Sequence, residues 1–323
     1  MTTTKIKAAV MQLQSSSATR RQHAFSSFRF LLAMSHPYAP SFNNTRLYAT
    51  RPGADERYMT SMQRVLHNRA QLRSSQPMEL LRIAGVSFEG RQEAVAQLKP
   101  FQGLAFKKEP ENPFDPNAVA VHTLDGIPLG YVPKERTGAF LHGVCFGKVH
   151  SVGQAEGGGM WGCSAEVQPR IPPVVVLPVP SHLTGKCHVA ELLKGPEWEA
   201  RKGEILKKAG GRCRVSGAAT NSVGEQWEVN KEAKVFELQG FSAQAPEVSR
   251  VAYMLDSGEN LRKEVAVMNG WNEEDLNAYV GYVEKQRHNH GSGEGGGEEW
   301  KLDLKVLEKM GVPVPEELIA YVV

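Results

Sequence analysis

Residues 109–121 read EPENPFDPNAVAV, from Glu109 to Val121, and this stretch holds the strongest clue to the architecture of the chain. Its three prolines stiffen a short polar turn because each one fixes its own φ angle. After Asn117 the sequence becomes an apolar run typical of a buried strand. The turn also holds Asn112, Phe114 and Asp115. These are more polar and aromatic side chains than a turn requires. The stretch predicts a strand introduced by a stiff loop that carries extra chemical groups.

Apolar runs of strand length lie on both sides of this loop. The predicted strands are Leu81–Val86, Leu104–Phe106, Ala118–His122 and Ile127–Val132, with a further pair around Gly157–Gly159 that ends near Val167. Helical spacing predicts short helices at Phe88–Leu98 and Lys134–Val144. Short strands with two small helices indicate an α+β domain over residues 78–170 with a β-barrel-like sheet.

The charge of the chain is unevenly distributed. The 323 residues include 38 Lys and Arg and 35 Asp and Glu, a net charge of +3. Residues 1–54 hold seven of the basic residues and no acidic one, so the other 31 basic and 35 acidic residues carry a net charge of −4. Affinity for a phosphate backbone grows with each neutralised phosphate, so this balance argues against a broad basic surface. No apolar run approaches the roughly 20 residues that a bilayer crossing needs, so no membrane partner is predicted.

The acid-free leader has the composition of an organellar presequence. It is rich in Arg, Ser and Ala and has an amphipathic stretch around Phe25–Met34. Arg46–Thr50, RLYAT, resembles a mitochondrial processing site, with arginine three residues before a cut after Tyr48. We therefore predict a mitochondrial presequence at residues 1–48, with a chloroplast address or a disordered basic tail as alternatives. Residues 49–77 are predicted to be a linker or mobile arm.

The second half of the chain has mainly helical patterns. Residues 171–195 are rich in proline and predict an extended connector. A helix is predicted from Pro196, the favoured first position, to Gly210-Gly211, which suit a left-handed C-cap. The other predicted helices are Asn260–Met268, Asn272–Lys285, with Asn272 as its N-cap, and Trp300–Met310. Residues 196–323 are therefore expected to form a mainly helical second domain.

The four cysteines, Cys145, Cys163, Cys187 and Cys213, are widely spaced and form no C-x-x-C pair, so free, mostly buried thiols are predicted. Cys187 and His188 are adjacent, but two neighbours seldom form a metal site alone. No G-x-x-x-x-G-K-[ST] phosphate loop occurs, so the sequence predicts no helicase motor. No cofactor is predicted.

Three motifs in order, GVSFEGRQ (Gly85–Gln92), EPENPFDPNAVAV and LGYVPKE (Leu129–Glu135), resemble those of a HIRAN domain. The resemblance covers about residues 80–168. It implies a small β-barrel-like fold with two helices that captures single-stranded DNA at a free 3′-hydroxyl end. It also implies that the domain has no catalytic activity of its own.

The resemblance implies a set of nucleic-acid-binding residues, because end capture needs a stacking platform, a hydroxyl acceptor and phosphate donors. Phe88 and Phe114 would supply the stacking faces, and Asp115 would accept the sugar hydroxyl. Asn112, Lys107 and Lys134 could contact a phosphate or sugar. Tyr131 stands where helicase-type domains carry a histidine that contacts the end, and Arg91 is a further candidate from the first motif.

Several residues depart from the helicase-type pattern. Phe88 and Phe114 replace tyrosines and Ser87 replaces an arginine, which removes two hydroxyl groups and a phosphate contact. Residues 78–170 carry nine basic and ten acidic residues, so the domain lends little electrostatic attraction. One alternative is that both phenylalanines are core residues and that Asp115 caps a turn. Another is that the ligand is RNA or a protein.

Residues from Trp198 onwards resemble a bacterial-type HNH endonuclease-like domain that has lost its metal ligands. The resemblance rests on WEARKGEILKKAGGRCRVSG (Trp198–Gly217), LQGFSAQAPEVSRVAYM (Leu238–Met254), VMNGWNEEDLNAYVGYV (Val267–Val283) and WKLDL (Trp300–Leu304). Cys213 is kept, but the expected ligand positions hold Ser216, Ala245, Val248, Ser249 and Tyr253. The first histidine motif is also absent around Gln226-Trp227-Glu228, and His288 and His290 lie outside the pattern. The resemblance implies a fold in which apolar packing replaces zinc.

The sequence as a whole predicts a non-enzymatic, nucleic-acid-binding protein of mitochondria, active in organellar DNA maintenance or repair. The predicted ligand is the 3′ end of single-stranded DNA, and the C-terminal domain would bind a protein partner. A non-catalytic interaction adaptor and a residual metal-dependent nuclease or hydrolase are the alternatives. The sequence does not predict an oligomeric state.

Overall fold

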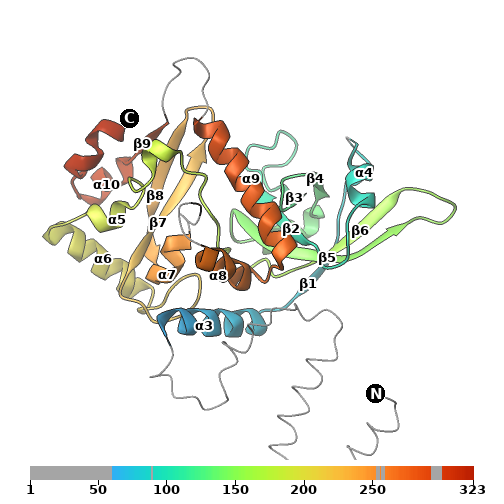
Figure 1. Cartoon of the computed structure of the whole chain (residues 1–323), viewed down its shortest axis with the longest axis horizontal. Helices are drawn as coiled ribbons and strands as arrows, with labels where there is room; N and C mark the ends of the chain where they lie inside the picture. The colour runs from blue at the N-terminus through green and yellow to red at the C-terminus, as the bar shows by residue number, and fades with distance from the viewer. Residues whose placement is uncertain (1–59, 89, 252–254, 256–258, 292–299) are drawn as a thin grey trace, which may run out of the picture. The chain divides into compact units, whose positions relative to one another are not determined.

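The computed structural model describes residues 60–88, 90–251, 255, 259–291 and 300–323, which are coloured in Figure 1. All of them belong to one unit, Ala54–Val323. The predicted presequence, residues 1–48, lies outside the described residues. Within the described ranges, no helix is long and apolar enough to cross a membrane.

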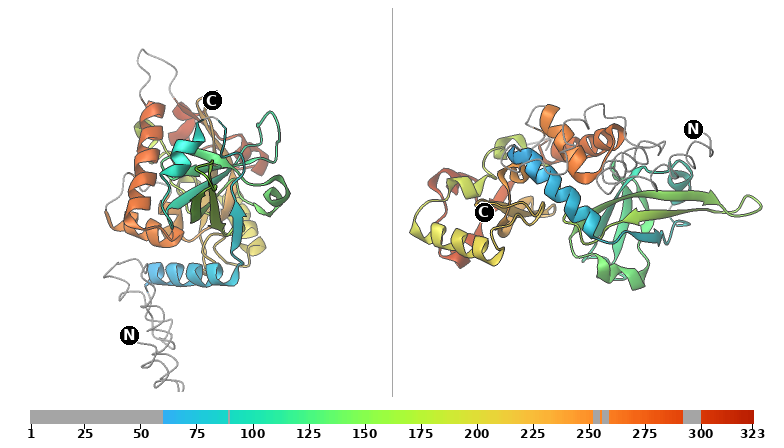
Figure 2. Two further views of the ribbon diagram at one scale, coloured as in Figure 1. Left: turned by 90° about the vertical axis from the view of Figure 1, so that its right-hand side faces the viewer. Right: turned by 90° about the horizontal axis from the view of Figure 1, so that it is seen from below.

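A six-stranded antiparallel sheet occupies the first half of the described chain. Its strands are β1 (Glu79–Arg82), β2 (Gly103–Lys108), β3 (Val119–Thr123), β4 (Pro128–Tyr131), β5 (Val144–Gln154) and β6 (Trp161–Val167). They lie in the order β1-β6-β5-β2-β3-β4, and the β5–β6 hairpin projects beyond the other strands (Figures 1 and 2). The sheet is curled into a half-barrel, and the predicted α+β fold with a barrel-like sheet is confirmed.

Residue Ala84, just after β1, connects the two edges of this sheet. Strand β1 pairs with β6, while the Ala84 N–H donates to the Tyr131 carbonyl at 2.8 Å and the Tyr131 N–H donates back to the Ala84 carbonyl at 2.9 Å. Gly130 allows this close approach, because a Cβ atom at residue 130 would lie 2.3 Å from the Ala84 carbonyl oxygen. The glycine of the LGYVPKE motif is therefore needed where the sheet curls.

The inner face of the sheet is apolar and is covered by two short helices. Leu104 and Phe106 of β2 and Val119 and Val121 of β3 are almost fully buried in one hydrophobic cluster. Helix α4 (Arg91–Ala96) and the 3₁₀ helix η3 (Lys134–Ala139) lie within the two predicted helical ranges. Helix η3 is shorter than predicted because Phe140 leaves the helix in an extended conformation and enters the core.

Helix α3 (Ser61–Ser75) is anchored to the rest of the protein, in contrast to the predicted linker or mobile arm. Val65 and Leu66 are buried. The guanidinium of Arg69, 2% exposed, donates to the carbonyls of Met268 at 2.6 Å, Val215 at 2.7 Å and Pro172 at 2.9 Å. These partners lie about a hundred or more residues away, so the local sequence does not reveal the anchoring.

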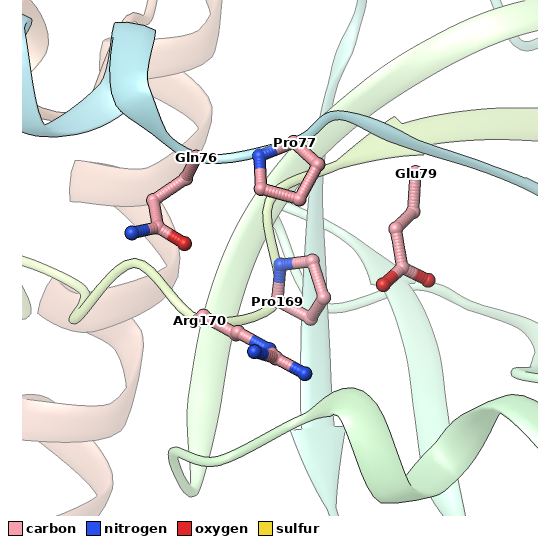
Figure 3. Close-up of a pocket in the computed structure, with 5 residues that line it drawn as sticks. All are labelled: Gln76, Pro77, Glu79, Pro169 and Arg170. Atoms are coloured by element: carbon pink, nitrogen blue, oxygen red, sulfur yellow. The ribbon is translucent and has the colours of Figure 1, made fainter.

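The segments that lead into and out of the six-stranded sheet lie side by side. The side-chain amide of Gln168 donates to the carbonyls of Arg73 at 2.6 Å and Gln76 at 3.0 Å. A small depression of about 140 Å³ lies at this junction and is lined by Gln76, Pro77, Glu79, Pro169 and Arg170 (Figure 3). Its residues join two chain segments, and none of them belongs to the predicted binding set.

The proline-rich segment over residues 171–195 is largely buried rather than a free spacer. Val174 and Val176 belong to the cluster beneath the later helices, whereas Leu183 and Cys187 belong to a third cluster around the C-terminal sheet. Two short helices interrupt it, η4 (Ser181–Leu183) and α5 (Val189–Leu192). The segment therefore connects the two halves by packing against both.

The C-terminal half combines helices with a three-stranded sheet, in the order β7-β8-β9, that the sequence did not predict. Its strands are β7 (Val223–Asn230), β8 (Val235–Ala243) and β9 (Lys301–Asp303), and its helices are α6 (Pro196–Lys208), α7 (Pro246–Ser249), α8 (Glu259–Asn269), α9 (Glu273–Gly291), α10 (Lys305–Met310) and η6 (Glu316–Tyr321). The helix predicted at Trp300–Met310 is wrong in its first part, because β9 pairs parallel to β8 there. The Asn272 side chain accepts the Asp275 N–H at 2.8 Å, and the predicted N-cap is confirmed.

Helix α9 packs on the outer face of the six-stranded sheet. The buried carboxylate of Asp275 accepts the Gly103 N–H at 2.7 Å, and a Cβ at residue 103 would lie 2.5 Å from Leu124. The Phe146 ring meets Trp271 and Tyr279 edge-on, with ring centroids 4.8 and 5.7 Å apart. The two predicted domains therefore share a buried contact.

Candidate nucleic-acid interface

Two large aromatic side chains of the predicted binding set are exposed. Phe114 is 95% exposed and Phe88 is 65% exposed. The alternative prediction that both are core residues is therefore wrong. Exposed rings on rigid elements are the platforms on which unpaired bases stack, and stacking contributes about 1–3 kcal/mol per base.

Side chains within the 109–118 loop hold its shape. Asn112 donates to Glu109 at 2.9 Å, and its carbonyl oxygen accepts the N–H groups of Phe114 at 3.0 Å and Asp115 at 3.2 Å. Asp115 Oδ1 accepts the Asn117 N–H at 2.9 Å. Asn112 thus uses its polar atoms inside the loop. The alternative prediction that Asp115 caps a turn holds for one of its two oxygens.

The second oxygen of Asp115 faces the end of β4. Asp115 Oδ2 lies 3.7 Å from the ammonium group of Lys134, whose side chain is 86% exposed. An ion pair this long and this exposed is weak. It places a carboxylate oxygen and a mobile cation side by side, next to the exposed ring of Phe114.

A second group of predicted residues converges on Gly85. A Cβ at residue 85 would lie 3.8 Å from the Phe88 ring, 3.9 Å from the Tyr131 ring and 3.4 Å from Arg91 Nη1. Arg91 Nη1 also donates to the Gly85 carbonyl at 3.1 Å, and the guanidinium carbon lies 5.2 Å from the centre of the Tyr131 ring. Gly85, with φ +66°, leaves the space in which these side chains meet.

The outer face of the sheet joins the two groups. Lys107, Ala120 and Tyr131 are paired across β2, β3 and β4, and paired residues of antiparallel strands point to the same face. Lys107 is exposed, and Ala120 between the two is small. Lys134, the first residue of η3, follows Tyr131 by three residues and is the residue that Asp115 of the loop contacts.

His122 lies on the same face and was missed by the sequence analysis. It pairs with Ala105 of β2, two residues from Lys107. Partial burial lowers its pKa, the charges of Lys107 and Arg91 lower it further, and Glu109 acts in the opposite direction. The sequence signal that could have identified His122 is that it is the one titratable residue in the apolar run Ala118–His122.

In the C-terminal half, several positions that the HNH resemblance singles out lie in a hydrophobic environment. The Ser216 N–H donates to Cys213 Sγ at 3.4 Å, in a turn whose Arg214 N–H donates to the Ala243 carbonyl at 2.8 Å. Cys213, Ala245 and Val248 are buried in one hydrophobic cluster, whereas Tyr253 lies outside the described residues. No group of three or more His, Cys, Asp or Glu side chains in the described part could hold a metal ion. All four cysteines are buried thiols, and none of them forms a disulfide with another described residue, as predicted.

Comparisons with known proteins identify one domain within the first half of the chain. Residues 81–163 match the family model of the HIRAN domain. The crystal structure of the HIRAN domain of human HLTF is similar over 28% of this chain and 74% of that chain, with 19% sequence identity and a TM-score of 0.21. No curated protein matches the chain as a relative. The matched residues hold the exposed aromatic rings, the Asp115 loop and the curled sheet, so residues 81–163 form a HIRAN domain.

Proposed function

We propose that this protein binds DNA through its HIRAN domain and captures the 3′ end of a single strand. The observation that carries the proposal is the pair of exposed rings, Phe88 and Phe114, together with the exposed Lys107 on the outer face of the sheet. Apolar rings in water are stabilised when a base covers them.

In the proposed complex each group has one role. Phe114 stacks on the terminal base and Phe88 on a neighbouring base. Asp115 Oδ2 accepts the hydrogen bond of the 3′-hydroxyl group. Lys134 turns from Asp115 to the nearest phosphate, which its long exposed contact to Asp115 permits. Asn112 keeps the loop closed, so little order has to form on binding.

The test compares binding of the full-length protein to labelled single strands that end in 3′-hydroxyl or 3′-phosphate, by fluorescence anisotropy at moderate salt. Wild type should prefer the hydroxyl end. Asp115→Asn keeps an oxygen for the Asn117 N–H but removes the charge, and should reduce the preference by about tenfold or more, as for hydrogen bonds to charged groups.

Phe114→Ala should weaken binding of both strands by about fivefold to a hundredfold, the value of one stacked base. Met160→Ala is the matched control, because Met160 is also an exposed apolar residue but lies at the turn of the β5–β6 hairpin. Equal binding of both ends would contradict end capture. Binding of RNA in preference to DNA, or of neither, would support the RNA or protein-adaptor alternative.

We also propose that the protein acts in mitochondria, in the maintenance or repair of organellar DNA. The support is the acid-free, Arg-rich leader and the RLYAT sequence at Arg46–Thr50. N-terminal sequencing of the mature protein from isolated mitochondria should begin at Ala49. Recovery of the intact Met1 terminus, or import into chloroplasts instead, would contradict the proposal.

For the C-terminal half we propose a nuclease-like domain without its metal, which acts as a non-catalytic interaction domain. The support is the turn of Cys213 and Ser216 beside Ala245 and Val248. If these are former ligand positions, the triple variant Ser216→Cys, Ala245→Cys, Val248→Cys should bind one zinc ion per chain by elemental analysis, whereas wild type binds none. Stoichiometric zinc in wild type would instead favour the residual-nuclease alternative.

A further inference from the structure

The C-terminal half presents a lysine beside the HIRAN face. Lys231 is an exposed residue in the turn between β7 and β8, and its ammonium group donates to the Gln286 side chain of α9 at 3.2 Å. In Figure 1 this turn and the C-terminal end of α9 lie together at the top of the picture. Lys231 is thus attached to the helix that packs on the six-stranded sheet.

One face of α9 is directed towards the HIRAN domain. Asp275 bonds Gly103, Tyr279 packs on Phe146, and the Tyr282 ring lies where a Cβ at Gly126 would clash at 2.6 Å. Residues 275, 279, 282 and 286 follow the spacing of a single helix face. Gln286 therefore continues this face and holds Lys231 near the sheet.

Lys107 of β2 continues the sheet face that the C-terminal half covers. Gly103, Ala105 and Lys107 alternate along the outer face of β2; the first two are covered by the C-terminal half, and Lys107 is exposed. Partial desolvation lowers the pKa of the Lys231 amine, and the charge of Lys107 acts in the same direction. Two ammonium groups that repel each other form a favourable site for an anion.

The turn that carries Lys231 is rigid. The Asn230 side chain accepts the Ala233 N–H at 3.0 Å and donates to Glu237 at 3.0 Å. Lys234 adopts φ +53°, a conformation that is uncommon for residues other than glycine, and its carbonyl accepts the Lys301 N–H at 3.1 Å. A turn held in this way presents Lys231 with little further loss of entropy on binding.

We propose that Lys107 and Lys231 together bind a backbone phosphate of the single strand, so that the strand runs from the candidate interface of the HIRAN domain onto the C-terminal half. This inference rests on the proposed function. It extends the interface beyond the HIRAN domain and assigns the C-terminal half a direct part in nucleic-acid binding.

The test uses the full-length protein and two labelled 3′-hydroxyl strands. One of about 4 nucleotides covers only the candidate interface of the HIRAN domain, and one of about 12 nucleotides also reaches Lys231. Lys231→Gln should weaken binding of the long strand by about threefold to tenfold and reduce its salt slope by about 0.7, the value of one phosphate on single-stranded DNA. Binding of the short strand and the preference for 3′-hydroxyl over 3′-phosphate should not change. Lys231→Glu should increase the effect.

Lys207→Gln is the matched control, because Lys207 is an exposed lysine on α6. Since Lys231 is exposed, both variants should keep the thermal stability of wild type. If Lys231→Gln and Lys207→Gln bind the long strand equally well, the inference is wrong while end capture stands. If wild type binds neither strand, both the proposed function and this inference are wrong.

Discussion

At the residue scale, the carboxyl group of Glu225 on β7 lies in an unusual environment. It is half-buried and accepts the Ala190 N–H of α5 at 2.7 Å. Burial raises its pKa to about 7, the charge of Glu191 acts in the same direction, and the hydrogen bonds to backbone N–H groups partly oppose the shift. Cys187, whose pKa is also raised by burial, lies within the electrostatic reach of Glu225.

This raised pKa predicts how stability depends on pH. The unfolded carboxyl loses its proton near pH 4.5, whereas the folded one keeps it up to about pH 7. Between these values the unfolded state binds fewer protons, so the free energy of unfolding should fall as pH rises, by on the order of 2–3 kcal/mol, and then level off.

Glu225→Gln should remove this part of the pH dependence and be more stable than wild type at pH 8. Urea denaturation followed by circular dichroism between pH 5 and pH 8 measures it. The matched control is Glu228→Gln, an exposed residue on the same strand. A pH dependence that survives in Glu225→Gln would show that another group carries it.

At the scale of the element, the join between the end of β1 and β4 depends on one glycine. Gly130 pairs with Val121 of β3 on one side and lies against the Ala84 carbonyl on the other. The adjacent Tyr131 belongs to the candidate interface. A backbone shift at residue 130 would therefore move a binding residue as well as weaken the sheet.

Gly130→Ala should lower the free energy of unfolding by about 2–4 kcal/mol, because the added methyl group would meet backbone rather than a flexible side chain. Gly138→Ala in η3 is the control, since a Cβ there meets no atom within 4 Å. Chemical denaturation compares the two. Equal stabilities would mean that the strands can separate at Ala84 without loss.

At the scale of the whole molecule, Arg69 joins three segments that are remote in the sequence. Its guanidinium bonds a carbonyl in the proline-rich segment, one in the turn after Cys213 and one at the end of α8. Burial and, to a smaller extent, the charge of the nearby Arg73 lower its pKa to about 9, so the group stays charged at neutral pH. One buried cation thereby satisfies three backbone acceptors.

Arg69→Met keeps most of the apolar stem but leaves these carbonyls unpaired, and should lower the free energy of unfolding by about 3–5 kcal/mol. Arg64→Met on the exposed side of the same helix should change it by less than about 0.5 kcal/mol. Thermal and urea unfolding measure both. A small effect at Arg69 would mean that α3 is not needed to hold the C-terminal half together.

Much of the fold was predictable because its signals are local. The period-two apolar runs placed the strands of the HIRAN domain, and Pro196 and Asn272 marked the starts of α6 and α9. The β7–β8 hairpin was not predicted, because Glu225 stands where the apolar alternation of β7 would continue and a bulge shifts its register. The strand at Lys301 was taken for helix because its pairing partner, β8, lies far away in the sequence.

The binding residues were likewise predictable only in part. The three motifs were enough to name Phe88, Phe114 and Asp115, because their chemical types and order are written in the chain. The tertiary structure alone decided that both rings are exposed and that the side chain of Asn112 forms its hydrogen bonds within its own loop. It also decided that His122 lies on the same sheet face as Lys107. It also brought Lys231 into hydrogen-bond contact with Gln286 of α9. Exposure, hydrogen-bond partners and the neighbourhood of charges depend on contacts between distant segments, and no local pattern encodes them.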